Sequence, residues 1–311
     1  MLKKKGGDLL KLATSTGDFD RFCNNYMDRI QYVHEAGFRY IDLSLYTALD
    51  NDPLLISENW KDTVAEILEY AENENIRFVQ CHSPGMNPLD PNQLELAVDR
   101  NIRSIEICGA LGIPNMVVHS GWDPDATKEA WFRRNKQFFE RLFDAMEQNN
   151  VCVLHENTAS SNMPWFYPKT GAEMAEFSNY VNHPLFHSCW DTGHANIEGS
   201  QYDEIITLGS DLYAIHLNDN RGAQDEHIIP YFGTLNLDEV MHALKDIHYK
   251  GPFTFEAGST LRPQNYWLGN RHEFSRDTRL AEPTLELQIA LEKFMYQVGK
   301  HILSTYDAFE E

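Results

Sequence analysis

The stretch Cys189-Trp190-Asp191-Thr192-Gly193-His194-Ala195-Asn196 decides the fold prediction. It is a short apolar run that stops at an aspartate and is followed by a glycine and a histidine. Other strand-like runs also end in metal-ligand residue types, and the full series is His82, His119, Glu156, Asp191, His216 and Glu256. Successive gaps are 37, 37, 35, 25 and 40 residues. Because a strand, a helix and two loops need about that much chain, each residue is predicted to lie near the end of a successive strand.

Eight strand-like segments alternate with helix-like segments from Leu9 onward, including predicted helices over residues 19–34 and 128–148. The apolar runs are continuous, as expected for strands that are buried on both faces. This pattern predicts an α/β fold, a (β/α)8 TIM barrel formed as one domain by residues 1–311. An open doubly wound sheet is the alternative, but Ser15-Thr16-Gly17-Asp18 is not the glycine-rich phosphate loop that such a sheet predicts after its first strand.

The composition restricts the class of partner. The formal net charge is −21 and the chain has no apolar run of membrane-spanning length. A field of that sign repels nucleic acid and anionic membranes. Residues 1–8 are basic without an apolar segment behind them, so we interpret them as a frayed start and not as a signal peptide. Five widely spaced cysteines without a CxxC pair favour reduced thiols and a cytoplasmic location.

Four of the strand-end residues predict a metal site. Side chains at the C-terminal strand ends of a barrel converge on one face, so Glu156, Asp191, His216 and Glu256 are expected to approach one another. Three carboxylates at one site raise one another's pKa unless a cation is present. Oxygen-rich ligation with one imidazole suits Mn²⁺, Mg²⁺, Co²⁺ or Fe²⁺, and Zn²⁺ is an alternative.

The sequence allows more than one role for three histidines and for one loop motif. His82, His119 and His194 would add ligands for further metals, bind substrate hydroxyls or simply pack. Asp225 and His227 are ligand types two residues apart in a loop after the seventh strand. That position favours a role in the site as much as a role in the loop structure.

Two further residues and one long segment have competing interpretations. Arg221 would clamp a substrate oxygen or form a surface salt bridge. His155 alternates to the opposite side from Glu156, which predicts a structural role. The segment from Gly258 to Pro283 is long for a loop and holds four arginines. It would cover the site, bind a phosphate or contact a second subunit, and the subunit contact of a homo-oligomer is ranked first.

At these motifs the chain resembles the xylose isomerase-like barrel superfamily over almost its whole length. One branch contains sugar and sugar-phosphate isomerases and epimerases, and another is endonuclease IV, which cuts DNA at abasic sites with three zinc ions. The nine ligand types of the nuclease have counterparts here in His82, His119, Glu156, Asp191, His194, His216, Asp225, His227 and Glu256.

Two departures from the nuclease pattern favour the isomerase branch. The loop from Asp225 to Thr234 looks like that of isomerase-like proteins, because the nuclease usually has an arginine between the Asp and the His. The stretch from Tyr46 to Asn59 contains three acidic residues and no Lys or Arg. Because a phosphate-tracking surface needs cations, a small-molecule substrate is expected and nucleic acid is not.

The resemblance therefore implies a divalent-metal-dependent isomerase or epimerase acting on a ketose or ketose phosphate through a metal-stabilised enediolate, with Mn²⁺ as the first expectation. Glu156 and Glu256 would be both metal ligands and the acid–base pair. Substrate would be held by His82, His119, His194, Arg221, Asp225 and His227. The alternatives are a three-zinc phosphodiesterase at abasic DNA and a lyase or dehydratase that uses the same metal site on a keto-sugar.

Overall fold

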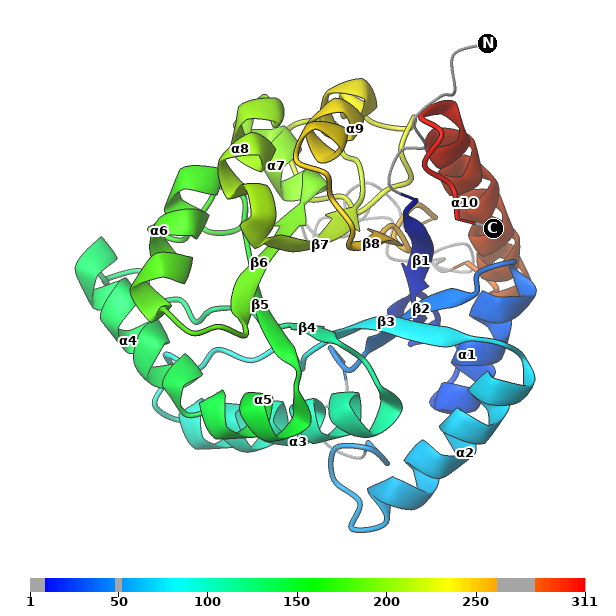
Figure 1. Ribbon diagram of the computed structural model, residues 1–311, viewed down its shortest axis with the longest axis horizontal. Coiled ribbons are helices and arrows are strands. Elements are labelled where there is room, and N and C mark those ends of the chain that lie inside the picture. Colours follow the sequence, from blue (N-terminus) through cyan, green and yellow to red (C-terminus); the bar gives the residue numbers. More distant parts are fainter. Residues whose placement is uncertain (1–8, 48–51, 262–282, 311) are drawn as a thin grey trace, which may run out of the picture.

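The computed structural model describes residues 9–47, 52–261 and 283–310 and shows a closed barrel of eight parallel strands in chain order (Figure 1). Each strand pairs with the next one, and β8 pairs with β1. The strands are β1 (Lys11–Ser15), β2 (Tyr40–Ser44), β3 (Arg77–His82), β4 (Asn115–Val117), β5 (Cys152–Glu156), β6 (Phe186–Asp191), β7 (Leu212–Leu217) and β8 (Pro252–Phe255). The predicted (β/α)8 TIM barrel is confirmed.

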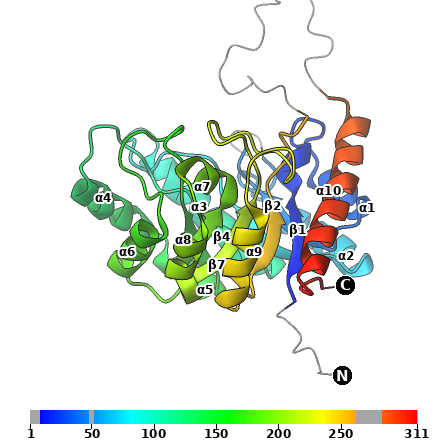
Figure 2. The same cartoon turned by 90° about the horizontal axis from the view of Figure 1, so that it is seen from above.

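The helices surround the barrel (Figures 1 and 2). The α-helices are α1 (Tyr26–Glu35), α2 (Trp60–Asn73), α3 (Leu94–Leu111), α4 (Lys128–Glu140), α5 (Phe143–Asn149), α6 (Gly171–Val181), α7 (Thr192–Glu198), α8 (Tyr202–Leu208), α9 (Leu237–Asp246) and α10 (Leu285–Thr305). Two 3-10 turns, η1 (Thr16–Phe19) and η2 (Gly209–Asp211), adjoin β1 and β7. Most helices follow a strand and pack back on the sheet, so every strand end faces the same side.

Two predicted helices have different boundaries. The helix predicted over residues 128–148 is divided into α4 and α5, because Arg141 and Leu142 donate i→i−3 hydrogen bonds that tighten the chain there. The helix predicted over 19–34 begins at Tyr26, where the Asn25 side chain accepts a hydrogen bond from the Met27 amide at 2.9 Å and caps the first turn. Apolar periodicity continues across the boundary between α4 and α5 and across the start of α1. It therefore reveals neither boundary.

The apolar core of the described residues has three clusters, of which the smallest is formed by Ala13, Tyr40 and Val79. Inside the barrel, Val117, Leu154, Cys189 and Ala214 are fully buried and form a floor below the strand ends. Outside it, a larger cluster fills the space between strands and helices. Trp131 of α4 lies at the centre of an aromatic group in that cluster and contacts Phe132, Phe166, Tyr167 and Phe177 with ring centroids 4.7–5.7 Å apart.

Replacement of Trp131 by alanine is expected to lower the free energy of unfolding by about 3–5 kcal/mol, because it leaves a large cavity among four aromatic rings. Urea titration followed by circular dichroism measures the change. Leu96→Ala is the control, since Leu96 is 46% exposed and its loss is expected to cost at most about 0.5 kcal/mol. A cost below about 1 kcal/mol for Trp131→Ala would show that the aromatic group is not closely packed.

Two sequence expectations concern the environment of the chain. Within the described ranges, no helix is long and apolar enough to cross a membrane. All five cysteines are free, and Cys81, Cys108 and Cys189 are buried.

Candidate metal centre and active site

The strand ends bring the predicted ligand residues to one face of the barrel. His82, Glu156 and Asp191 are the last residues of β3, β5 and β6. His216 is the penultimate residue of β7, and Glu256 directly follows β8. Because the strands are parallel and closed into a barrel, these side chains reach one common space although they are far apart in sequence.

Four of these residues form a compact ligand group. Glu156, Asp191, His216 and Glu256 each offer one ligand atom, and these atoms lie within 4.8 Å of one another. His216 Nδ1 is 2.8 Å from Glu156 Oε1 and 3.2 Å from Glu256 Oε2. Ligands at about 2.0–2.2 Å on opposite sides of one ion are separated by up to about 4.4 Å. The four atoms are therefore close to the arrangement that a single divalent cation requires.

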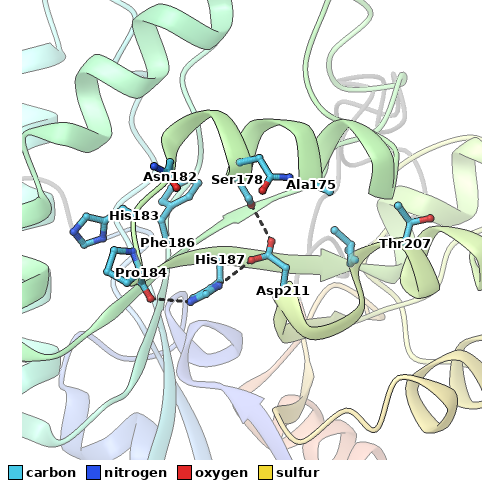
Figure 3. Close-up of a pocket in the computed structure, with 11 residues that line it drawn as sticks. Ala175, Ser178, Asn182, His183, Pro184, Phe186, His187, Thr207 and Asp211 are labelled. Carbon is cyan, nitrogen blue, oxygen red and sulfur yellow. Dashed lines mark hydrogen bonds and ion pairs between the residues drawn. The ribbon is translucent and has the colours of Figure 1, made fainter.

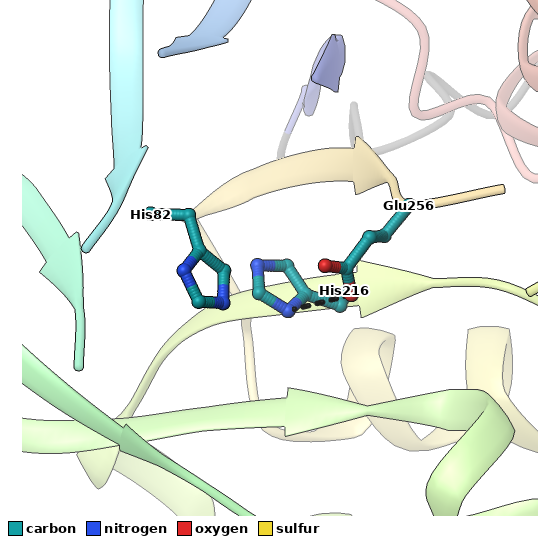
Figure 4. A group of neighbouring side chains, drawn as sticks. All are labelled: His82, His216 and Glu256. Carbon is teal, nitrogen blue, oxygen red and sulfur yellow. Dashed lines mark ion pairs between the residues drawn. The ribbon is translucent and has the colours of Figure 1, made fainter. Parts of the chain in front are cut away.

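Glu156 also takes part in a second ligand group. Its other oxygen, Oε2, is 2.9 Å from His119 Nε2 and 3.9 Å from His82 Nε2. His82 also belongs to a group with His216 and Glu256, in which the two imidazole rings stack with centroids 5.6 Å apart (Figure 4). Glu156 thus has one oxygen on each of two adjacent groups, which is the position of a bridging carboxylate.

A third group lies beside the first two and consists of His194, Asp225 and His227. The Asp225 carboxylate is 3.2 Å from His194 Nε2 and 3.0 Å from His227 Nε2. His227 has a φ of 47°, which is uncommon for a residue other than glycine. A hydrogen bond at 2.9 Å between His227 Nδ1 and the Glu256 carbonyl oxygen holds this conformation. Both residues of the Asp-x-His motif therefore face the site.

The carboxylates and imidazoles shift one another's pKa. Burial raises the pKa of Asp191 to about 6, although the imidazoles of His194 and His227 oppose this shift. Burial would also raise the pKa of Glu256, but His216 and His227 lower it to about 2. Burial lowers the pKa of His216, but Glu256 and Glu156 are among the groups that hold it well above its usual value. The imidazoles thus offset the repulsion among the buried carboxylates, and a divalent cation would do the same.

The stretch around Asp191 folds into a short helix that the sequence did not predict. Asp191 caps α7, and its Oδ1 accepts a hydrogen bond from the His194 amide at 2.6 Å. Its Oδ2 accepts from Asn218 Nδ2 at 2.7 Å. A Cβ at Gly193 would lie 1.7 Å from Asn218 Oδ1. Glycine is therefore required here for close approach between α7 and the residue that orients Asp191.

The remaining predicted residues lie outside these groups. Arg221 is largely exposed and forms an ion pair with Glu226, which is the surface salt bridge considered for it. His155 is buried outside the barrel, 3.0 Å from Ser178 Oγ of α6, as its predicted structural role requires. Most of the segment from Gly258 to Pro283 lies outside the described residues, so its predicted roles in covering the site or in subunit contact stay predictions.

Three residues of the site were not predicted. Gln80 Nε2 lies 2.7 Å from His216 Nε2. Asn157 donates to the Asp191 carbonyl oxygen at 3.0 Å, and Asn218 contacts the Asp191 carboxylate as described. Gln80 is two residues before His82 and Asn218 is two residues after His216, so strand alternation places both on the faces that carry the ligands. That alternation is the signal that would have identified Gln80 and Asn218.

A separate pocket of about 470 Å³ lies between the C-terminal ends of α6 and α8 (Figure 3). Its lining includes residues before and at the start of β6, the opposite end of the strand from Asp191. Within it, Asp211 accepts a hydrogen bond from Ser178 at 2.9 Å and pairs with His187 at 2.8 Å. None of the predicted site residues lines this pocket, so it is distinct from the ligand groups.

Comparison with known families agrees with this architecture. The model of the xylose isomerase-like TIM barrel family matches residues 30–278. The chain therefore belongs to that family, as the sequence resemblance predicted.

Curated relatives match parts of the chain. The y4fM protein of Sinorhizobium fredii is 30% identical over 160 residues, which cover 49% of this chain and 50% of that protein. A probable endonuclease 4 of a Geobacter species is 33% identical over 161 residues, covering 46% and 56%. An L-ribulose 3-epimerase of a Methylomonas species is 34% identical over 94 residues, covering 29% and 30%. The chain thus matches about half the length of the first two relatives and less of the third.

Solved structures show the same fold at lower identity. A D-psicose 3-epimerase from Clostridium cellulolyticum H10, solved with D-tagatose, has a TM-score of 0.73 and 17% identity, covering 94% of this chain and 99% of that chain. The IOLI protein with a bound zinc atom has a TM-score of 0.71 and 20% identity, covering 96% and 99%. These likenesses confirm the barrel over nearly its whole length.

Proposed function

We propose that this protein is a divalent-metal-dependent isomerase or epimerase that acts on a ketose or a ketose phosphate. The observation that carries the proposal is the placement of two carboxylates against one imidazole. Glu156 from β5 and Glu256 after β8 both face His216 Nδ1, at 2.8 and 3.2 Å. A group with two carboxylates from different sides of the barrel provides one base for each side of a substrate.

Glu156, Asp191, His216 and Glu256 would hold the cation, since their four ligand atoms fit one ion. When bound, the cation would act as a Lewis acid on the negative charge that develops at a substrate carbonyl oxygen. The oxygen-rich ligand set suits Mn²⁺, Mg²⁺, Co²⁺ or Fe²⁺, and Mn²⁺ is the first choice. The IOLI protein, which shares this fold, was solved with a bound zinc atom, and this is consistent with a divalent ion in this chain.

The acid–base step is assigned to the two glutamates. One carboxylate removes a proton from the carbon next to the carbonyl, and the other returns a proton to the opposite face. Return to the opposite face inverts that carbon, which is epimerisation. His194 and His227, held by Asp225, lie next to this group and would bind substrate hydroxyl groups. His82 and His119 would do so on the other side of Glu156.

Solvent deuterium uptake tests the proposal. Ketoses and ketose phosphates are incubated in D₂O with enzyme and Mn²⁺, and loss of a carbon-bound proton signal is followed by NMR. At least one substrate is expected to exchange only with the metal present, and excess chelator is expected to stop the exchange. Failure of every ketose to exchange with metal-loaded protein would contradict the proposal.

A second candidate function rests on the presence of three ligand groups rather than one. His82, His119 and Glu156 form one group, and His194, Asp225 and His227 form another beside the four-ligand group. Three adjacent cations in this arrangement would suit hydrolysis of a phosphodiester, since clustered cations stabilise both the attacking and the leaving oxygen. The probable endonuclease 4 relatives are consistent with this alternative.

The metal content separates the two candidates. Elemental analysis of protein purified without chelator is expected to give about one tightly held ion per chain for the epimerase, as only the four-ligand group would be filled. About three zinc ions per chain, together with nicking of a duplex that contains an abasic site, would favour the phosphodiesterase. The lyase alternative predicts loss of water from the substrate instead of recovery of an epimer, which the same NMR spectra would show.

A further inference from the structure

Gln80 lies directly against the imidazole of the four-ligand group. It is fully buried on β3, and its amide nitrogen is 2.7 Å from His216 Nε2, on the side of the ring away from the carboxylates. The register between β2 and β3 shifts by one residue, so that Asp42 pairs with Gln80 and Val79 is left out of the pairing. Such bulges redirect side chains beside active sites. The direction of Gln80 toward His216 is therefore built into the strand.

The contact between two nitrogens restricts the position of the imidazole proton. An amide NH₂ group only donates, so His216 Nε2 accepts from it only when the ring proton is on Nδ1. In that tautomer Nδ1 donates to Glu156 and has no lone pair for a cation. Gln80 Oε1 is then a buried acceptor without a hydrogen-bond partner. Such an unpaired group costs about 1–3 kcal/mol.

A half-turn of the amide removes this conflict. Gln80 Oε1 then accepts a hydrogen bond from His216 Nε2–H, and the Nδ1 lone pair points at the carboxylate oxygens of the ligand group. The NH₂ group of Gln80 turns away from the ring. Asp42, its partner in the strand register, has a buried Oδ1 that also lacks a hydrogen-bond partner and would accept from this NH₂ group. Histidine ligands of metals usually donate their second N–H to such an acceptor.

We propose that Gln80 is a positioning residue for the metal centre: its amide oxygen accepts a hydrogen bond from His216 Nε2–H and holds the imidazole with Nδ1 toward the cation. This inference rests on the proposed divalent-cation site. Gln80 touches no substrate in this assignment and acts only through His216. Its effect is on cation affinity and on the tautomer of His216.

Two replacements of Gln80 by residues of similar size test whether its side chain accepts a hydrogen bond from His216 or donates one to it. Gln80→Met removes both hydrogen-bonding atoms and is expected to weaken Mn²⁺ binding about 10-fold to 100-fold, as is usual for loss of such a partner. Gln80→Glu keeps an acceptor beside His216 Nε2–H and loses the donor toward Asp42, so it is expected to bind Mn²⁺ more tightly than Gln80→Met. Mn²⁺ affinity is measured by electron paramagnetic resonance of the free ion.

Gln288→Met is the matched control, because Gln288 is a buried glutamine on α10 with 1% exposure and no hydrogen-bond partner for its amide atoms. It is expected to leave Mn²⁺ affinity unchanged. Long-range proton–nitrogen NMR of zinc-loaded protein is expected to show His216 with its proton on Nε2, and faster solvent exchange of that proton in Gln80→Met.

Wild-type affinity in Gln80→Met, or an affinity in Gln80→Glu as weak as in Gln80→Met, would overturn the inference while leaving the metal site intact. Failure of the unmodified protein to bind Mn²⁺ would instead remove the proposed function on which the inference depends. The two failures therefore give different results in the same titration.

Discussion

Replacement of Glu256 by glutamine is expected to reduce deuterium exchange from substrate by about 100-fold to 10,000-fold, the range for loss of a positioned acid–base group. The amide keeps the shape and one neutral ligand oxygen but cannot accept a proton from carbon. The contact with His216 at 3.2 Å is weakened because the negative charge is lost. Exchange is measured by NMR at saturating Mn²⁺, so that a lower cation affinity does not imitate loss of the base.

Glu95→Gln is the control for removal of a carboxylate. Glu95 lies on α3 at the surface and pairs with Arg141, so its replacement is expected to leave exchange unchanged. The urea midpoint of Glu256→Gln is expected to stay close to that of the unmodified protein. Undiminished exchange in metal-loaded Glu256→Gln would remove Glu256 from the acid–base pair, although it would not remove it from the ligand group.

Substitution of Gly193 by alanine is expected to lower the free energy of unfolding by about 2.5–6 kcal/mol. The added Cβ would lie 1.7 Å from Asn218 Oδ1, which forces the side chain to move. Steric overpacking typically costs about 1–3 kcal/mol. Loss of the buried hydrogen bond from Asn218 Nδ2 to Asp191 Oδ2 adds about 1.5–3 kcal/mol. Urea titration measures the sum, and Mn²⁺ affinity is expected to fall because Asp191 loses its orientation.

A double-mutant cycle with Asn218→Ala identifies the cause. Alanine at position 218 removes the obstructing oxygen, so Gly193→Ala is expected to cost at least about 1 kcal/mol less in that background than alone. Equal costs in both backgrounds would show that the glycine is needed for another reason, such as the approach of Asn220 Nδ2 at 3.2 Å.

The positions of the proposed metal ligands were predictable because a TIM barrel converts sequence spacing into proximity. Glu156 and Glu256 are 100 residues apart, yet each ends or follows a strand, and parallel strands of one barrel end on one face. The prediction needed only the strand ends and the ligand residue types. It did not need the contacts themselves, and for this reason the convergence of Glu156, Asp191, His216 and Glu256 was predictable without any knowledge of packing.

The helix after Asp191 was missed for a local reason. Thr192–Glu198 is seven residues long, contains a glycine and shows no apolar stripe, so periodicity gives no signal. Its start is set by the Asp191 carboxylate, which caps the helix and also belongs to the ligand group. An aspartate before such a segment is a standard helix-start residue, and that signal was available. The helix turns His194 toward Asp225, which the predicted loop would not have required.

By itself the sequence determined the barrel, the strand ends and the residue types that converge there, because hydrophobic runs and chain spacing are properties of the chain alone. Only the tertiary structure decided which atoms of those residues meet. The division of the two Glu156 oxygens between His216 and His119 depends on side-chain direction, and the contact of Gln80 with His216 joins residues 136 positions apart. Such contacts follow from strand register and from a one-residue shift between β2 and β3, and neither is encoded by the spacing of residue types along the chain.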